Sequence, residues 1–127
     1  MSKTLADYHV LTSSTFQLSS PGGHKNFSLD SDKIGSDFVS GGDMMREPIL
    51  AFNLRALTKN VTMKIEVNSS QVFVFHAENE EKMIVRGYWQ VIPGSVFHKN
   101  QVNTIHFEVD EGEAKIGDVI LWFQRKA

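Results

Sequence analysis

The chain of 127 residues contains no cysteine. This absence excludes disulfide bonds, thiolate metal ligands and cysteine nucleophiles together, so packing, hydrogen bonding or assembly must stabilise the fold. Long apolar runs are missing as well. No segment approaches the roughly 18 apolar residues of a membrane helix, and residues 1–8 lack the apolar core of a secretory signal. We therefore expect a soluble, cytoplasmic protein without a membrane partner.

The sequence also lacks an excess of basic residues. Lysine and arginine together number 13 against 15 aspartate and glutamate residues, the formal net charge is −2, and the cations are scattered along the chain. Binding to a phosphate backbone requires a basic patch that neutralises several phosphates. The composition therefore argues against nucleic acid as a partner.

No catalytic signature occurs in the sequence. We find no nucleophile elbow, no phosphate-binding glycine loop and no zinc-protease helix motif. Glu66 and Glu108 could hydrolyse a glycosidic bond only if the fold placed the two carboxylates on either side of it. The spacing of His76, His98 and His106 matches no metal-binding motif, so we expect ordinary surface histidines. We predict that the protein is not an enzyme.

What is present is the composition of one globular domain. Hydrophobic residues make up 41% of the chain and charged residues 22%. A chain of this length can bury a core without covalent cross-links. We predict a single domain over residues 1–127.

Several segments alternate between apolar and polar residues with the period of two that a half-buried strand requires. The clearest are residues 61–68 and 50–57, and the short polar connection between them predicts a hairpin. Residues 105–109 repeat the pattern. The turn at 110–113 then leads into a final strand at about 115–125.

The N-terminal third is less regular. Glycine, proline and serine gather at residues 19–23, 35–36 and 40–43 and divide this part into short pieces, which predicts long loops or short edge strands. Turns at intervals of about 8 to 12 residues are typical of a sandwich or a barrel. We predict an all-β fold, an antiparallel jelly-roll-type β-sandwich.

Two segments, residues 72–75 and 119–123, are apolar on both faces. A strand of a two-layered sandwich buries one face, so the second face needs a cover, either from residues 5–18 of the same chain or from another subunit. Because most soluble oligomers are closed and symmetric, we predict a homo-oligomer whose interface includes Ile120 and Trp122.

Aromatic and polar side chains near the strand ends are the candidates for ligand binding. Alternation around residue 89 predicts that Trp89 packs in the core and that Tyr88 lies exposed beside Arg86. The loops at about 30–43 and 76–83 would surround the ligand. The predicted ligand-binding residues are Tyr88, Arg86, His76 and Asp43.

The first of these loops is also the candidate for a metal. Asp30, Asp32 and Asp37 offer the hard oxygen ligands that calcium prefers. Their spacing is not that of an EF-hand loop, and local turns of aspartate side chains explain the same residues. Calcium is the less favoured interpretation, and we expect no cofactor.

From about Asn68 to Gln124 several features follow one another in order. An asparagine-containing turn follows an amphipathic strand, and then come Trp89-Gln-Val-Ile-Pro93, Asn103-Thr-Ile-His-Phe107 and a final hydrophobic strand. This order resembles that of the galactose-binding-domain-like jelly rolls, except that Gln101-Val-Asn103 lacks the glycine of their Gly-x-Asn turn. The resemblance covers under half of the chain. It implies a β-sandwich whose loops bind carbohydrate in many members and hold calcium in some.

Two functions remain open on the sequence. The first is a non-catalytic, lectin-like recognition module that binds carbohydrate through loops at one end of the sandwich. The second is a structural protein that forms a homo-oligomer through its apolar strand faces. Glycan binding by a monomer would support the first function, whereas a stable oligomer without glycan binding would support the second.

Overall fold

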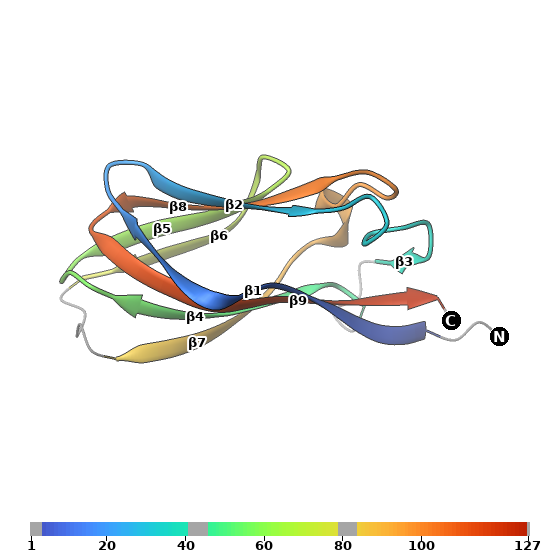
Figure 1. The fold of residues 1–127 in the computed structure, drawn as a ribbon, viewed down its shortest axis with the longest axis horizontal. Coiled ribbons are helices and arrows are strands. Elements are labelled where there is room, and N and C mark those ends of the chain that lie inside the picture. Colours follow the sequence, from blue (N-terminus) through green and yellow to red (C-terminus); the bar gives the residue numbers. More distant parts are fainter. Residues whose placement is uncertain (1–3, 41–45, 79–83, 127) are drawn as a thin grey trace.

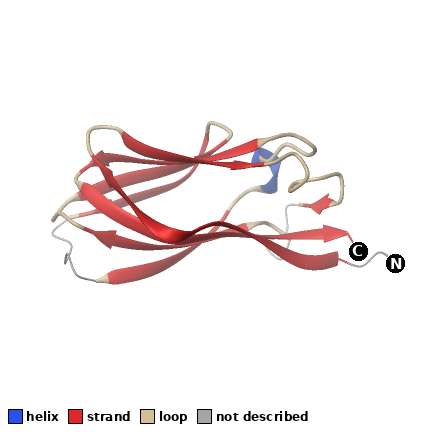
Figure 2. Cartoon of the chain, in the orientation of Figure 1, coloured by secondary structure: helices blue, strands red, loops and turns tan. Residues whose placement is uncertain are grey.

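The computed structural model describes residues 4–40, 46–78 and 84–126. Two antiparallel sheets pack face to face and form a sandwich (Figures 1 and 2). This arrangement confirms the predicted jelly-roll-type β-sandwich. Sheet A contains, in spatial order, β1 (Thr4–Ser19), β9 (Glu113–Lys126), β4 (Ile49–Ala56) and β7 (Val85–Val91), with the short β3 (Phe38–Val39) beside the end of β9. Sheet B contains β2 (Gly23–Leu29), β8 (Asn103–Glu111), β5 (Val61–Val67) and β6 (Ser70–Ala77). A single turn of 3₁₀ helix, η1 (Gly94–Val96), precedes β8.

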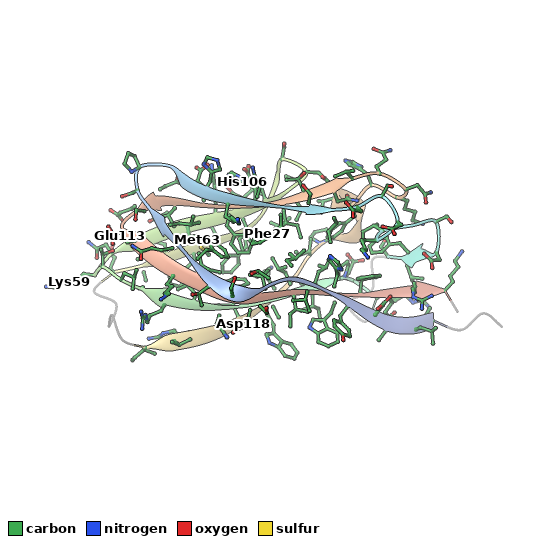
Figure 3. The ribbon with its side chains drawn as sticks, in the orientation of Figure 1. Phe27, Lys59, Met63, His106, Glu113 and Asp118 are labelled. Carbon is green, nitrogen blue, oxygen red and sulfur yellow. The ribbon has the colours of Figure 1, made fainter. Side chains whose placement is uncertain are left out.

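The core lies between the two sheets and follows the alternation of the sequence. In β5, Val61, Met63, Ile65 and Val67 are completely buried, and the residues between them face solvent. Figure 3 shows Met63 and Phe27 pointing between the sheets. Burying a side chain of this size stabilises the fold by about 1.5–3 kcal/mol, so the inner faces supply the main stabilising contribution.

The predicted hairpin of residues 50–57 with 61–68 is wrong. The first of these strands, β4, pairs with β9 and β7 in sheet A, whereas β5 pairs with β8 and β6 in sheet B. The connection therefore crosses from one layer to the other. A second crossing, at Gly112 with φ +77°, lies beside it, and the Leu57 amide donates to the Glu113 carbonyl oxygen at 2.9 Å. Alternation specifies which face is buried, but it does not specify the neighbouring strand.

The prediction of short strands or loops at the N-terminus is wrong for residues 4–19. These residues form β1, a strand of 16 residues that pairs with β9 along its length. The register shifts between Val10 and Thr12 and again between Thr12 and Thr15, and such bulges break the regular alternation by which a strand is recognised in a sequence.

The position of β1 also shows whether the N-terminal segment covers the second apolar face of residues 119–123. Val119, Leu121 and Phe123 point into the core, while Ile120 and Trp122 point outward. Because β1 lies beside β9 within the same sheet, it does not lie over that outer face. The N-terminal segment is therefore not the cover that the sequence had offered as an alternative.

Candidate functional site

The outer face of sheet A carries two neighbouring rows of apolar side chains. In one row Tyr8, Trp122, Ile49 and Val91 lie opposite one another across the four strands. In the next row Val10, Ile120, Ala51 and Trp89 do the same. We call these eight residues the aromatic face.

Three rings of the aromatic face are open to solvent. Trp89 is 76% exposed, Tyr8 56% and Trp122 41%. The Tyr8 and Trp122 rings lie against each other with centroids 5.1 Å apart and an interplanar angle of 40°. Trp89 stands apart from that pair, two strands away on β7.

The area of this surface limits what it can bind. An aromatic side chain presents about 150–250 Å², so the exposed fractions leave roughly 350 Å² of aromatic surface in water. A functional patch on a monomer measures about 300–600 Å². One side of a standard protein–protein interface buries about 800 Å². The area of the three rings therefore matches a small ligand, and it is less than half of what one side of a standard interface buries.

A depression of about 200 Å³ opens beside the aromatic face, toward the end of sheet A where β4 crosses to sheet B. We call it the polar groove. The polar groove is lined by Thr15, Asn53, Leu54, Arg55, Val85, Lys115, Ile116, Gly117 and Asp118.

Irregular backbone creates the polar groove. Asp118 adopts φ +52°, and the pairing of β4 with β9 shifts between Ala51 and Asn53. Such a bulge bends a strand and redirects its side chains. A Cβ atom on Gly117 would approach the Thr15 side chain to 2.7 Å, so glycine is required for this close approach of β1 to β9.

The polar groove offers hydrogen-bond donors and acceptors, and charges of both signs. Asn53 Nδ2 donates to Asp118 Oδ2 at 3.1 Å, which holds this amide and carboxylate together at the rim. Figure 3 shows Asp118 on the outer side of sheet A. Arg55 and Lys115 lie opposite each other on β4 and β9 and supply two cations.

The outer face of sheet B is different in character. Glu108 lies 3.3 Å from Lys64 Nζ and 3.1 Å from His106 Nε2. Hydrogen bonds from His106, then from Asp110 and Lys64, lower the pKa of Glu108 to about 2, and the hydrogen bond shared with Glu108 raises the pKa of Asp110. Figure 3 shows His106 on this outer side. These charged groups satisfy one another.

Sheet B also carries a depression, of about 500 Å³, between Asn26, Asn68 and His98. It is larger than the polar groove, but its lining contains no tryptophan, tyrosine or phenylalanine. Asn68 donates to the Val96 carbonyl oxygen and to Asn103, and Asn26 contacts His106 at 2.5 Å. Its polar groups are thus largely engaged within the protein, and we favour sheet A as the site.

The structure does not gather the predicted ligand-binding residues into one cluster. His76 lies on the outer face of sheet B, where Nδ1 is 2.8 Å from Thr62 Oγ1. Arg86 and Tyr88 lie on the other sheet, on the side of β7 that faces sheet B. Asp43 lies outside the described residues, as do parts of both predicted loops.

The predicted orientations of Trp89 and Tyr88 are reversed. Trp89 is the exposed ring, while Tyr88 is half-buried and stacks on Phe52 with centroids 5.5 Å apart. The cause is the pairing with β4, because Tyr88 lies opposite the buried Phe52 and Trp89 lies opposite the outward-facing Ala51. Sequence alternation could not detect this, since residues 84–91 carry apolar side chains in both phases.

The candidate calcium ligands lie near a cation. Asp37 is 3.8 Å from Arg125 Nη1, and Asp32 lines the same depression as Lys33 and Arg125. Asp30 is exposed at the end of β2. Within residues 4–40, 46–78 and 84–126, no three histidine or acidic side chains are arranged to hold a metal ion. An arginine at the carboxylates favours ion pairing there over calcium.

Carbohydrate-binding modules are among the solved structures that share this fold. The CBM36-1 domain of a multidomain xylanase from the hindgut metagenome of Trinervitermes trinervoides matches 91% of this chain and 96% of its own, at 12% identity and a TM-score of 0.58. In fold, the chain resembles a carbohydrate-binding module. A family 35 carbohydrate-binding module from Clostridium thermocellum matches over 92% of this chain and 98% of its own, at 11% identity and a TM-score of 0.56.

Longer proteins contain the same fold as a part. BuGH86 in complex with neoagarooctaose matches all of this chain at 10% identity and a TM-score of 0.65, but only 20% of its own length, so the chain spans about a fifth of that protein. The sequence matches no protein-family model and no curated protein. These likenesses confirm the predicted jelly-roll resemblance at the level of the fold.

In the part of the chain that the structure describes, no helix has the length and apolar character to cross a membrane.

Proposed function

We propose that the protein is a non-catalytic carbohydrate-binding module whose ligand stacks on the aromatic face and forms hydrogen bonds in the polar groove. The observation that carries this proposal is that the two surfaces are adjacent on sheet A. Trp89 lies two residues from Gly87, and Gly87 pairs with the groove residue Asn53.

A sugar ring needs both kinds of surface. Its C–H face is apolar and packs on aromatic rings, whereas its hydroxyl groups at the edge require donors and acceptors. The Asn53 amide and the Asp118 carboxylate provide these at the rim of the groove. The carbohydrate-binding modules that share the fold support the same class of ligand.

The proposed site differs from the loops that the sequence suggested. Strand pairing holds β9 and β4 on both sides and the edge strands β1 and β7 on one side, so side chains on this face are placed more precisely than those of a loop. Trp122 and Trp89 come from strands that flank β4. Such a rigid surface pays little conformational entropy on binding.

A glycan array followed by titration calorimetry tests the proposal. We expect the wild-type protein to bind, and we expect Trp89→Ala and Trp122→Ala each to weaken binding by about tenfold or more, since each removes one stacking ring. Val74→Ala is the matched control, because Val74 is 53% exposed on the outer face of sheet B. Unchanged binding by both tryptophan variants, or a wild-type protein that binds no glycan, contradicts the proposal.

A further inference from the structure

Two cations in the polar groove are placed directly opposite each other. Arg55 on β4 pairs in register with Lys115 on β9, and both side chains project from the outer face of sheet A. Side chains at directly opposite positions have Cβ atoms about 5 Å apart, and like charges there destabilise a sheet. The pair therefore needs a compensating negative charge.

Within the described residues, the protein does not supply that charge at this pair. Across residues 4–40, 46–78 and 84–126, neither Arg55 nor Lys115 forms an ion pair. The Nε atom of Arg55 is shielded from solvent and has no acceptor. A shielded donor without a partner is uncommon in native proteins, and it means that this side of the guanidinium group has no neutralising contact among the described residues.

The negative charge that lines the groove has another partner. Asp118 is the acidic residue among those that line the groove, and its Oδ2 accepts the hydrogen bond from Asn53. The lining therefore carries two positive charges and one negative charge. The protein as a whole has a net charge of −2, so this local excess of positive charge is not a consequence of a basic surface.

We propose that the polar groove binds an anionic substituent, a carboxylate or a sulfate ester, on the saccharide that stacks on Trp89. This inference rests on the proposed function and specifies its ligand. The guanidinium group of Arg55 presents a planar pair of donors that matches the oxygens of such a group, and Lys115 adds a second charge. Val85, opposite Arg55 on β7, closes one side of the groove.

Matched pairs of polysaccharides that differ in charge test this inference. Polygalacturonate and its methyl-esterified form test the carboxylate, and κ-carrageenan and agarose test the sulfate ester. We expect the wild-type protein to prefer the charged member of one pair by about tenfold or more, because hydrogen bonds between charged groups are the strong ones. The preference should decline in 1 M salt, where the screening length is about 3 Å.

Two variants connect the preference to the groove. Arg55→Gln and Lys115→Gln should each reduce the ratio of the affinity for the charged member to that for the neutral member, because each variant removes one of the two cations of the groove. Lys99→Gln is the control, because it removes an exposed lysine in the loop before β8. If Arg55→Gln fails to fold, Lys115→Gln and the salt dependence still test whether the groove binds an anionic substituent.

The outcomes separate this inference from the proposed function. Equal binding of the charged and neutral members, with both variants unchanged, overturns the anionic ligand and leaves a carbohydrate-binding module. Loss of the preference in Lys99→Gln as well would assign it to overall charge and would also overturn the inference. Failure of the wild-type protein to bind any of these glycans or any member of the array overturns both.

Discussion

Asn103 is a polar side chain at the start of β8 that is completely buried. Its amide group donates to the carbonyl oxygens of His98 and Gln101, at 2.8 and 3.1 Å, and its Oδ1 accepts from the His98 amide and from Asn68 Nδ2. One side chain thereby forms hydrogen bonds with the loop before β8 and with the turn between β5 and β6. The sequence marked this asparagine through the family resemblance, but the partners come from the fold.

Replacing this asparagine should be costly. Asn103→Ala leaves several buried donors and acceptors without partners, so we expect the free energy of unfolding to fall by about 3 kcal/mol. Urea denaturation measures the loss. Gln101→Ala is the control, since Gln101 is exposed and contributes its backbone carbonyl group, and it should change stability by less than about 0.5 kcal/mol. Similar losses in the two variants would contradict this role.

Glu108 provides a prediction about pH. Its pKa is lowered from 4.5 to about 2, chiefly by the hydrogen bond from His106. Because the pKa is lower in the folded than in the unfolded chain, its contribution to stability is complete above about pH 4.5 and is lost as the pH falls toward 2. The raised pKa of Asp110 acts in the opposite sense and offsets part of this loss.

An NMR titration of the side-chain carboxyl resonances measures the pKa values of both groups directly. We expect Glu108 to titrate well below a free glutamate and Asp110 above a free aspartate. His106→Ala should move the pKa of Glu108 upward, because it removes the largest cause of the shift. An unchanged Glu108 titration in that variant would show that His106 is not the cause.

At the scale of the element, β7 shows why a strand's phase needs its neighbour. Tyr88 packs on Phe52 and lies 5.6 Å from Phe75 between ring centroids. Trp89 projects to the solvent side of the same strand. Since residues 85, 89 and 91 on one side and 84 and 88 on the other are all apolar or aromatic, hydrophobic alternation alone cannot choose between the two phases.

Removal of the two side chains should therefore lower the free energy of unfolding by different amounts. Tyr88→Ala opens a gap between the sheets and should lower the free energy of unfolding by about 2–3 kcal/mol. Trp89→Ala should change stability by about 0.5 kcal/mol or less, because the ring is 76% exposed. Thermal and urea denaturation of the two variants measure this difference. A larger loss of stability in Trp89→Ala than in Tyr88→Ala would instead support the orientation expected from the sequence, with Trp89 in the core.

At the scale of the whole molecule, the two outer faces have different characters. Sheet B presents ion pairs, including Lys64 with Glu108, whereas sheet A presents exposed aromatic rings and two unpaired cations in the described part of the chain. The homo-oligomer expected from the sequence would use the same face as the proposed glycan, since Ile120 and Trp122 belong to it. Assembly and ligand binding through this face therefore exclude each other.

Trp122→Glu tests which of them uses the face. Trp122 is 41% exposed and points away from the core, so we expect the variant to stay folded and to lose glycan binding. We expect light scattering to give a monomer for both proteins at low micromolar concentration, because the exposed aromatic area is about half of what one side of a standard interface buries. A stable wild-type oligomer that Trp122→Glu dissociates would support assembly instead.

The sequence by itself determined the fold class, because alternation with a period of two and frequent turns permit few arrangements other than a sandwich. It also identified Ile120 and Trp122 as side chains on a second apolar face, since residues 119–123 are apolar throughout. These inferences depend on local patterns, which a sequence states directly.

Only the tertiary structure decided which strands are neighbours, and with them the site. Tyr8, Trp89 and Trp122 are far apart along the chain and share one face because β1, β9, β4 and β7 lie side by side in a particular register. Arg55 and Lys115 face each other for the same reason. Strand pairing between distant segments arises from the packing of the whole core, and no local pattern encodes it.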